Sequence, residues 1–190
     1  MTRDRRRAFA LALLLVVAPS LPGCTGSDSD AQIVRGRGLQ VMKLHDDAEA
    51  ALYRAAANAA FNVGPGLTLL VHPRRLPRGA GLAGGDPLPQ GLISALRERG
   101  IVQGTCEPPV GRDTPQCAAS APGYVIRGSD AFRAAGDTVL FHFMAERYAT
   151  AGTGRQDALR FEKIYQLVPR GNEWRVAREA RAPESVEQAK

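Results

Sequence analysis

The stretch Thr138-Val-Leu-Phe-His-Phe-Met-Ala-Glu-Arg-Tyr-Ala149 indicates the fold more clearly than any other part of the chain. Successive side chains of a β-strand point to opposite faces, so apolar residues at every second position predict a strand with one buried face. Four apolar residues share one face: Val139, Phe141, Phe143 and Ala145. Three polar or amphipathic residues share the other: His142, Glu146 and Tyr148.

The flanking segments extend this strand into a meander. A short strand is predicted at Gly123–Arg127, and a second long strand at Ala158–Val168. Gly171-Asn172 is typical of a tight turn, and it leads into a last strand around Trp174–Arg178. Long neighbouring strands joined by short connections favour antiparallel pairing.

The first half of the chain alternates helices and strands. Small apolar residues recur at helical spacing over Val41–Phe61, which predicts an amphipathic helix that packs closely against a sheet. Leu67–Val71 is rich in β-formers. A helix is predicted from Asp86-Pro87 to Arg99, with Gly100 as its stop, and a strand follows at Ile101–Cys106.

These elements predict an α+β domain over residues 39–182, in which two helices pack on a curved, mainly antiparallel sheet that ends in a meander. Residues 183–190 are predicted to be a solvated tail. Over roughly the last hundred residues the pattern resembles the cone-shaped nuclear-transport-factor-like and cystatin-like α+β folds. The resemblance maps no functional residue onto this chain, and such folds host enzymes, binders and scaffolds alike, so function depends on the site.

The first residues have the composition of an export signal. Met1–Arg7 is short and basic, and Phe9–Ala18 is an apolar stretch that Pro19 ends. A membrane-spanning helix needs about 20 apolar residues, so residues 1–23 predict a signal peptide instead. Arg6-Arg7-Ala8-Phe9 resembles a twin-arginine signal, whereas the strongly apolar stretch favours the general secretory route.

Leu21-Pro22-Gly23-Cys24 resembles the lipobox of bacterial lipoproteins. The resemblance implies cleavage before Cys24, a diacylglyceryl thioether on its sulfur and an acylated amine, and several acyl chains anchor a protein stably to a bilayer. Residues 24–38 would then be the lipidated cysteine and a flexible tether. Thr25 in place of Asp implies the periplasmic side of the outer membrane in a two-membraned bacterium. The alternative is ordinary cleavage after Ser20, which leaves a free thiol.

Net charge argues against a nucleic-acid-binding protein. The whole chain carries +6, but residues 1–23 hold four Arg and one Asp, so the remainder is near +3. Neither this modest positive charge nor export from the cytoplasm is typical of a nucleic-acid-binding protein.

The cysteines predict one disulfide. If Cys24 is lipidated, Cys106 and Cys117 remain as an even pair in an oxidising compartment. The segment between them contains three prolines and no periodicity, and closing a loop of this length contributes about 2.5–3 kcal/mol. A redox-active pair is more often C-x-x-C, and a metal site needs further ligands.

Two groups of polar residues are candidate sites. Arg74, Arg75 and Arg78 lie within five residues of a loop rich in Pro and Gly, which favours contact with anionic lipid headgroups or an acidic envelope protein. The alternative is a solvated loop. His142, Glu146 and Tyr148 could act as acid–base residues if the sheet encloses a pocket; otherwise they form the solvent face of a strand.

Cofactor and metal motifs are not convincing. Gly79-Ala-Gly81-Leu-Ala-Gly84 matches G-x-G-x-x-G, but it neither follows directly on a strand nor begins a helix, so no cofactor is predicted. His45, His72 and His142 lack the spacing of zinc ligands, so no metal is predicted.

The sequence therefore predicts a membrane-anchored envelope lipoprotein whose domain binds a partner or ligand. One alternative is a small cone-fold enzyme with acid–base or hydrolytic chemistry, and a second is a structural envelope subunit. The inner face of the meander distinguishes binder from enzyme, since it is either hollow or filled by five aromatic residues: Phe141, Phe143, Phe161, Tyr165 and Trp174.

Overall fold

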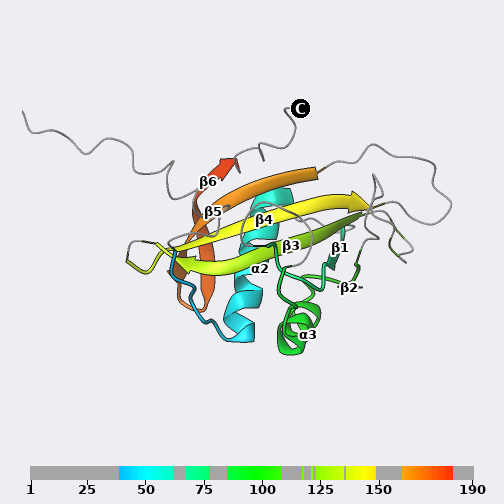
Figure 1. Ribbon diagram of the computed structural model, residues 1–190, viewed down its shortest axis with the longest axis horizontal. Coiled ribbons are helices and arrows are strands. Elements are labelled where there is room, and N and C mark those ends of the chain that lie inside the picture. Colours follow the sequence, from blue (N-terminus) through cyan, green and yellow to red (C-terminus); the bar gives the residue numbers. More distant parts are fainter. Residues whose placement is uncertain are drawn as a thin grey trace, which may run out of the picture.

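The computed structural model describes residues 39–61, 67–77, 85–107, 117, 121, 123–134, 136–148 and 160–181. The predicted signal peptide, Cys24 with its tether, Arg78, the glycine motif at 79–84 and the tail at 183–190 lie outside these residues. The described part forms one sheet and two helices (Figure 1). In chain order the elements are α2 (Asp46–Phe61), β1 (Thr68–Val71), α3 (Gln90–Glu98), β2 (Gly104–Thr105), β3 (Gly123–Arg133), β4 (Val139–Tyr148), β5 (Arg160–Arg170) and β6 (Glu173–Arg181).

The sheet combines a parallel edge with an antiparallel meander. Its strand order is β2-β1-β3-β4-β5-β6 within the described residues. β1 pairs in parallel with β2 and with β3, whereas β3, β4, β5 and β6 pair antiparallel in sequence. The connection from β1 to β2 contains α3, as a parallel crossover requires. The predicted α+β class and C-terminal meander are confirmed.

Both helices begin later than the sequence predicts. α2 starts at Asp46 because the preceding residues pair with the sheet: Val41 forms a bridge with Phe132, and the Met42 N–H donates to the Ala131 carbonyl. α3 starts at Gln90 because residues 85–88 pair with the loop after β1. Backbone pairing in each case takes up the donors and acceptors that another helical turn would use.

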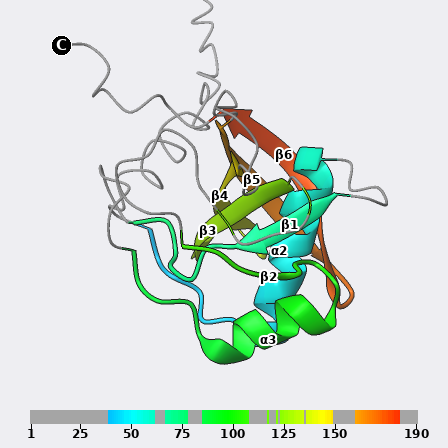
Figure 2. The ribbon, with the colours of Figure 1, turned by 90° about the vertical axis from the view of Figure 1, so that its right-hand side faces the viewer.

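The two helices cover the same face of the sheet (Figures 1 and 2), and the space between them and the strands is filled. Phe141, Phe143 and Tyr165 are fully buried there, and Phe161 and Trp174 pack against them. The Trp174 indole N–H donates to the Ala48 carbonyl in α2, at 3.1 Å. The inner face of the meander is therefore a packed core rather than a hollow.

Close approach of α2 to β3 requires a glycine. A Cβ on Gly128 would lie 2.3 Å from the Phe141 ring and 2.7 Å from the Tyr53 ring, so any side chain would clash with the core. The two rings contact each other edge to face, with centroids 5.2 Å apart. This packing brings the first turns of α2 next to the middle of β3, where Glu49 and Arg75 form an ion pair that is largely shielded from solvent.

The opposite face of the sheet carries two smaller apolar clusters. One joins Phe132, Leu140 and Ile164, and the other packs Leu70, Val125 and Tyr148 around the disulfide. The predicted disulfide between the two cysteines is confirmed: Cys106 and Cys117 are bonded, and both are buried.

Candidate functional site

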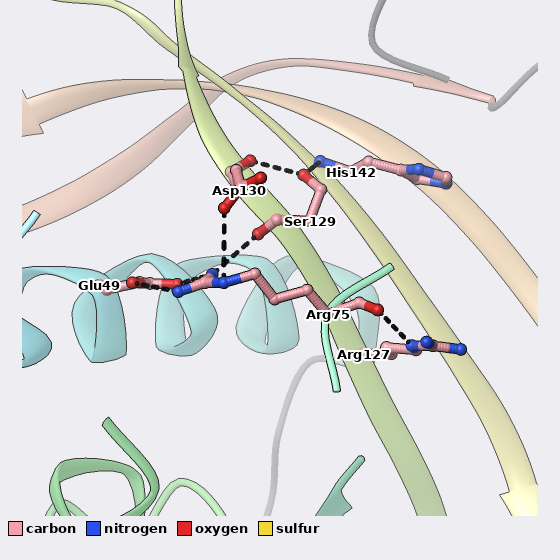
Figure 3. A network of polar contacts seen from close by, with 6 residues as sticks. All are labelled: Glu49, Arg75, Arg127, Ser129, Asp130 and His142. Atoms are coloured by element: carbon pink, nitrogen blue, oxygen red, sulfur yellow. Dashed lines mark hydrogen bonds and ion pairs between the residues drawn. The ribbon is translucent and has the colours of Figure 1, made fainter. Parts of the chain in front are cut away.

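Arg75 is the centre of a buried ion-pair network (Figure 3). Its two terminal nitrogens contact the two carboxylate oxygens of Glu49 in α2, with Nη2 at 3.0 Å from Oε2. Nη1 also donates to the Ser129 carbonyl at 3.3 Å, and Nε lies 3.4 Å from Asp130 Oδ1. The Arg75 and Glu49 side chains are only 11% and 8% exposed. Burial lowers the pKa of Arg75, but the hydrogen bonds and charge of Glu49 outweigh it and hold the pKa above its ordinary value.

A β-bulge supplies the acceptors on the sheet side. The pairing of β3 with β4 shifts register between Gly128 and Ala131, so Ser129 and Asp130 leave the regular ladder. The Ser129 hydroxyl donates to the Asp130 carbonyl at 2.6 Å and accepts from the His142 N–H at 3.0 Å. The bulge can therefore offer Arg75 both a carbonyl and a carboxylate.

Residues 72–77, called the arginine loop below, are held by this network and by backbone hydrogen bonds. The Leu76 N–H donates to the Gly128 carbonyl, and the Arg75 N–H donates to the Asp86 carbonyl, each at 2.8 Å. Arg127 Nε, from β3, donates to the carbonyl oxygens of Arg74 and Arg75 at 3.0 and 2.9 Å. The backbone of the arginine loop is thus held by β3 and by the segment before α3, and α2 holds the Arg75 side chain.

The three predicted arginines do not share one environment. The Arg74 side chain is 46% exposed, lies 3.4 Å from the exposed carboxylate of Glu107, and donates weakly to the Gly85 carbonyl at 3.5 Å. Arg75 lies inside, and Arg78 falls outside the described residues. The interpretation of a solvated loop is therefore wrong for Arg75, because packing of α2 on β3 brings two carboxylates to it. Contact of Arg74 with an external anion stays a prediction.

His72 orients the exposed part of the arginine loop. Its Nδ1 lies 3.0 Å from the Arg74 backbone nitrogen, which donates to it. Burial, and then the charge of Arg127, lower the pKa of His72 to about 4, so the ring is neutral at neutral pH and can accept this hydrogen bond.

The predicted acid–base residues lie on the sheet face opposite the helices. Four polar side chains on this face lie close together on the neighbouring strands β4 and β5, and they are called the outer polar row below: His142, Glu146, Arg160 and Glu162. Arg160 Nη2 lies 2.6 Å from Glu162 Oε1, and its Nε lies 3.8 Å from Glu146 Oε1. His142 Nε2 lies 3.8 Å from Glu162 Oε1.

Burial changes the proton affinity of this row. The His142 side chain, in a residue 7% exposed overall, has its pKa lowered by burial to about 4. Burial raises the pKa of Glu146, while the positive charges of Arg160 and Arg127 oppose that rise. Nε2 of His142 has no hydrogen-bond partner within the described chain. At neutral pH the row thus offers a neutral, buried imidazole beside a carboxylate.

Tyr148 does not join the other two candidates. Its hydroxyl donates to the Ala121 carbonyl at 2.9 Å, its ring is fully buried beside the disulfide, and burial raises its pKa. Sequence reasoning also missed Arg160 and Glu162, although their separation of two on a predicted strand places them on one face. The expectation of a solvent-exposed face is wrong at His142 and Tyr148, which are both buried.

The described residues hold neither a cluster of metal ligands nor a membrane-spanning helix. No three His, Cys, Asp or Glu side chains in this part of the chain come together as a metal site would require. None of its helices is long and apolar enough to cross a membrane.

Comparison of the chain with protein-family models, with curated proteins and with solved structures finds no match. The resemblance of residues 21–24 to a lipobox, and that of the C-terminal half to cone-shaped folds, therefore stay predictions. The features of the chain that bear on function are the arginine loop, the outer polar row and the packing around them.

Proposed function

We propose that the protein is an exported, lipid-anchored binding module of a bacterial envelope, and that it contacts an anionic partner through the arginine loop. The observation that carries this proposal is the contrast between two adjacent arginines. Arg75 is buried in internal ion pairs, whereas Arg74 stands at the surface on a backbone that is hydrogen-bonded to β3 and to the segment before α3. A charged group on an ordered backbone loses less conformational entropy on binding than one on a free loop.

Packing of the core favours a binder over the alternative of a cone-fold enzyme. That alternative needs a pocket on the inner face of the meander, lined by His142 and Glu146. The inner face is filled by buried aromatic rings, and both residues lie on the opposite face. The alternative of a structural envelope subunit has no observation in its favour beyond the predicted envelope localisation, which the binding module shares.

Lipid anchoring is tested by metabolic labelling with a palmitate analogue. The wild-type chain should carry the label, and Cys24→Ser should lose it, because the thioether forms on that sulfur. Equal labelling of both proteins would contradict the lipoprotein assignment without bearing on the arginine loop.

Anion contact is tested with the acylated protein and vesicles. The ratio of binding to phosphatidylglycerol-containing vesicles over neutral vesicles removes the contribution of the acyl chains. Arg74→Gln should lower this ratio about fivefold at low salt, since one basic residue near an anionic surface contributes about 1 kcal/mol. The difference should shrink as salt is added.

Arg175→Gln is the matched control, because Arg175 is an exposed arginine of β6 and its loss changes the net charge equally. An equal drop in both variants would mean that only net charge matters. No drop for Arg74→Gln on vesicles, but loss of an envelope protein that copurifies with the wild type, would move the partner from lipid to protein. No drop in either assay would refute the binding role of Arg74.

A further inference from the structure

A small depression lies between the second half of α2 and the turn that follows α3. It has a volume of about 200 Å³ and is open on one side. Buried apolar side chains form its base: Ala57, Leu69 and Ile101. Polar side chains border it: Arg54, Asn58 and Arg99. The depression therefore has room for a small organic molecule rather than for a single water.

The two guanidinium groups at this depression differ in charge balance. Arg99 contacts Asp47 Oδ1 through Nε at 3.1 Å and Nη2 at 2.7 Å, so a carboxylate already neutralises it. Arg54 Nη2 donates to the Arg99 carbonyl at 2.8 Å, which orients the guanidinium without neutralising it. Within the described residues Arg54 contacts no carboxylate. An arginine has five N–H donors, so most of those on Arg54 are left for a ligand.

The backbone N–H groups beside the depression are already hydrogen-bonded, so only side chains can donate to a ligand. The N–H groups of residues 99–102 all donate to carbonyls of α3, which ends there, and the Gln103 N–H donates to the Leu69 carbonyl. The lining side chains that can donate to a ligand without giving up a carboxylate within the described residues are therefore those of Arg54 and Asn58, beside an apolar base. A few polar groups that converge over an apolar surface are the usual make-up of a small-molecule site.

We infer that this depression binds a carboxylate that carries a short branched apolar group. The carboxylate would take two parallel hydrogen bonds from Arg54, the geometry that guanidinium and carboxylate share, and a further one from Asn58. The apolar group would cover Ala57, Leu69 and Ile101. A free short-chain acid and the C-terminal residue of a peptide both present this chemistry. The site is separate from the arginine loop and does not depend on its proposed role.

The test is a titration of the ¹⁵N-labelled full chain in a neutral detergent, followed by amide NMR. Isovalerate represents the free acid, and N-acetylglycyl-leucine represents a peptide C-terminus. We expect saturable shifts at the amides of Arg54, Asn58 and Gly100 with at least one of them, and the one that binds identifies the source. Isovaleramide, which has the same shape without the charge, should bind about tenfold or more weakly.

Variants decide whether the depression is the site. Arg54→Gln should weaken binding about ten- to hundredfold, the usual effect of losing charged hydrogen bonds. Asn58→Trp changes an exposed helical position, so it should leave folding intact while its ring fills the opening and abolishes binding. Arg97→Gln, an exposed arginine of α3 outside the depression, should bind as the wild type does.

Three results would overturn the inference. They are the absence of saturable shifts with either carboxylate, equal affinity for isovalerate and isovaleramide, and unchanged affinity in both Arg54→Gln and Asn58→Trp. If Arg54→Gln does not fold, the outcome with Asn58→Trp decides alone.

Discussion

Replacement of Arg75 by Gln tests the ion-pair network most directly. The change leaves Glu49, which is 8% exposed, and the nearby carboxylate of Asp130 without their shared cation. Removal of one partner from a buried pair costs about 3–5 kcal/mol, because the remaining charge stays desolvated. For a domain of this size that loss lowers the melting temperature by about 10 °C or more. Thermal unfolding followed by circular dichroism measures it.

The neighbouring residue is the matched control. Arg74 is 46% exposed and its ion pair with Glu107 lies at the surface, so Arg74→Gln should cost about 0–1 kcal/mol. The double variant Glu49→Gln/Arg75→Gln should be more stable than the sum of the single effects predicts, because it removes both charges of the tightest pair. Similar small losses for Arg74→Gln and Arg75→Gln would refute the reasoning that burial of the network determines its contribution.

Three further predictions concern the rest of the fold. Burial lowers the pKa of His142 to about 4, whereas a histidine in the unfolded chain has a pKa of about 6.5. Between pH 4 and pH 6.5 this histidine therefore binds a proton in the unfolded chain but not in the folded one. The stability contributed by the neutral ring is therefore complete above pH 6.5 and lost as pH falls toward 4. The free energy of unfolding should fall by about 2 kcal/mol between pH 7 and pH 5 for this reason. Urea unfolding of His142→Leu should lack this part of the pH dependence. Gly128→Ala forces a Cβ to 2.3 Å from a buried phenylalanine ring and should cost about 1–3 kcal/mol in chemical unfolding, whereas Gly104→Ala, with its nearest contact at 3.6 Å, should be neutral. Replacement of both Cys106 and Cys117 by Ser removes the disulfide that closes a loop over 11 positions, and it should lower the free energy of unfolding by about 2.5–3 kcal/mol. A reducing agent should lower the melting temperature of the wild type but not that of the double variant.

Local patterns in the sequence were enough to predict the meander and the disulfide. The alternation around Phe141 and Phe143 identifies both the strand and the face that packs against the helices, because a strand repeats every two residues whatever it packs against. The turn at Gly171-Asn172 likewise acts locally, with Gly171 at φ 61°, a conformation that glycine adopts readily. Cys106 and Cys117 could be paired by elimination on the expectation that Cys24 is lipidated and that the chain is exported, and the structure bears out the pair itself.

Helix starts and the burial of charges could not be predicted in this way. Val41 and the residues around Asp86 lie just before helix-forming segments, so the sequence includes them in the helices. In the structure their backbone groups instead pair with distant segments. Residues in a loop rich in proline and glycine look solvated, and nothing local distinguishes Arg74 from Arg75. Long-range pairing of this kind depends on which surfaces the core brings together.

The sequence alone thus determined the class of the domain and the face of β4 that packs against the helices, and, on the expectation that Cys24 is lipidated, the cysteines that pair, since each depends on periodicity or on counting. Tertiary structure decided which charges are inside. Glu49 lies 26 positions from Arg75, and Ser129 lies 54 positions from it. These groups meet because α2 packs over the Gly128 position and a bulge turns the next two residues of β3 toward the arginine loop. An ion pair forms wherever the fold places its partners, so only the fold could assign Arg75 to the interior and Arg74 to the surface.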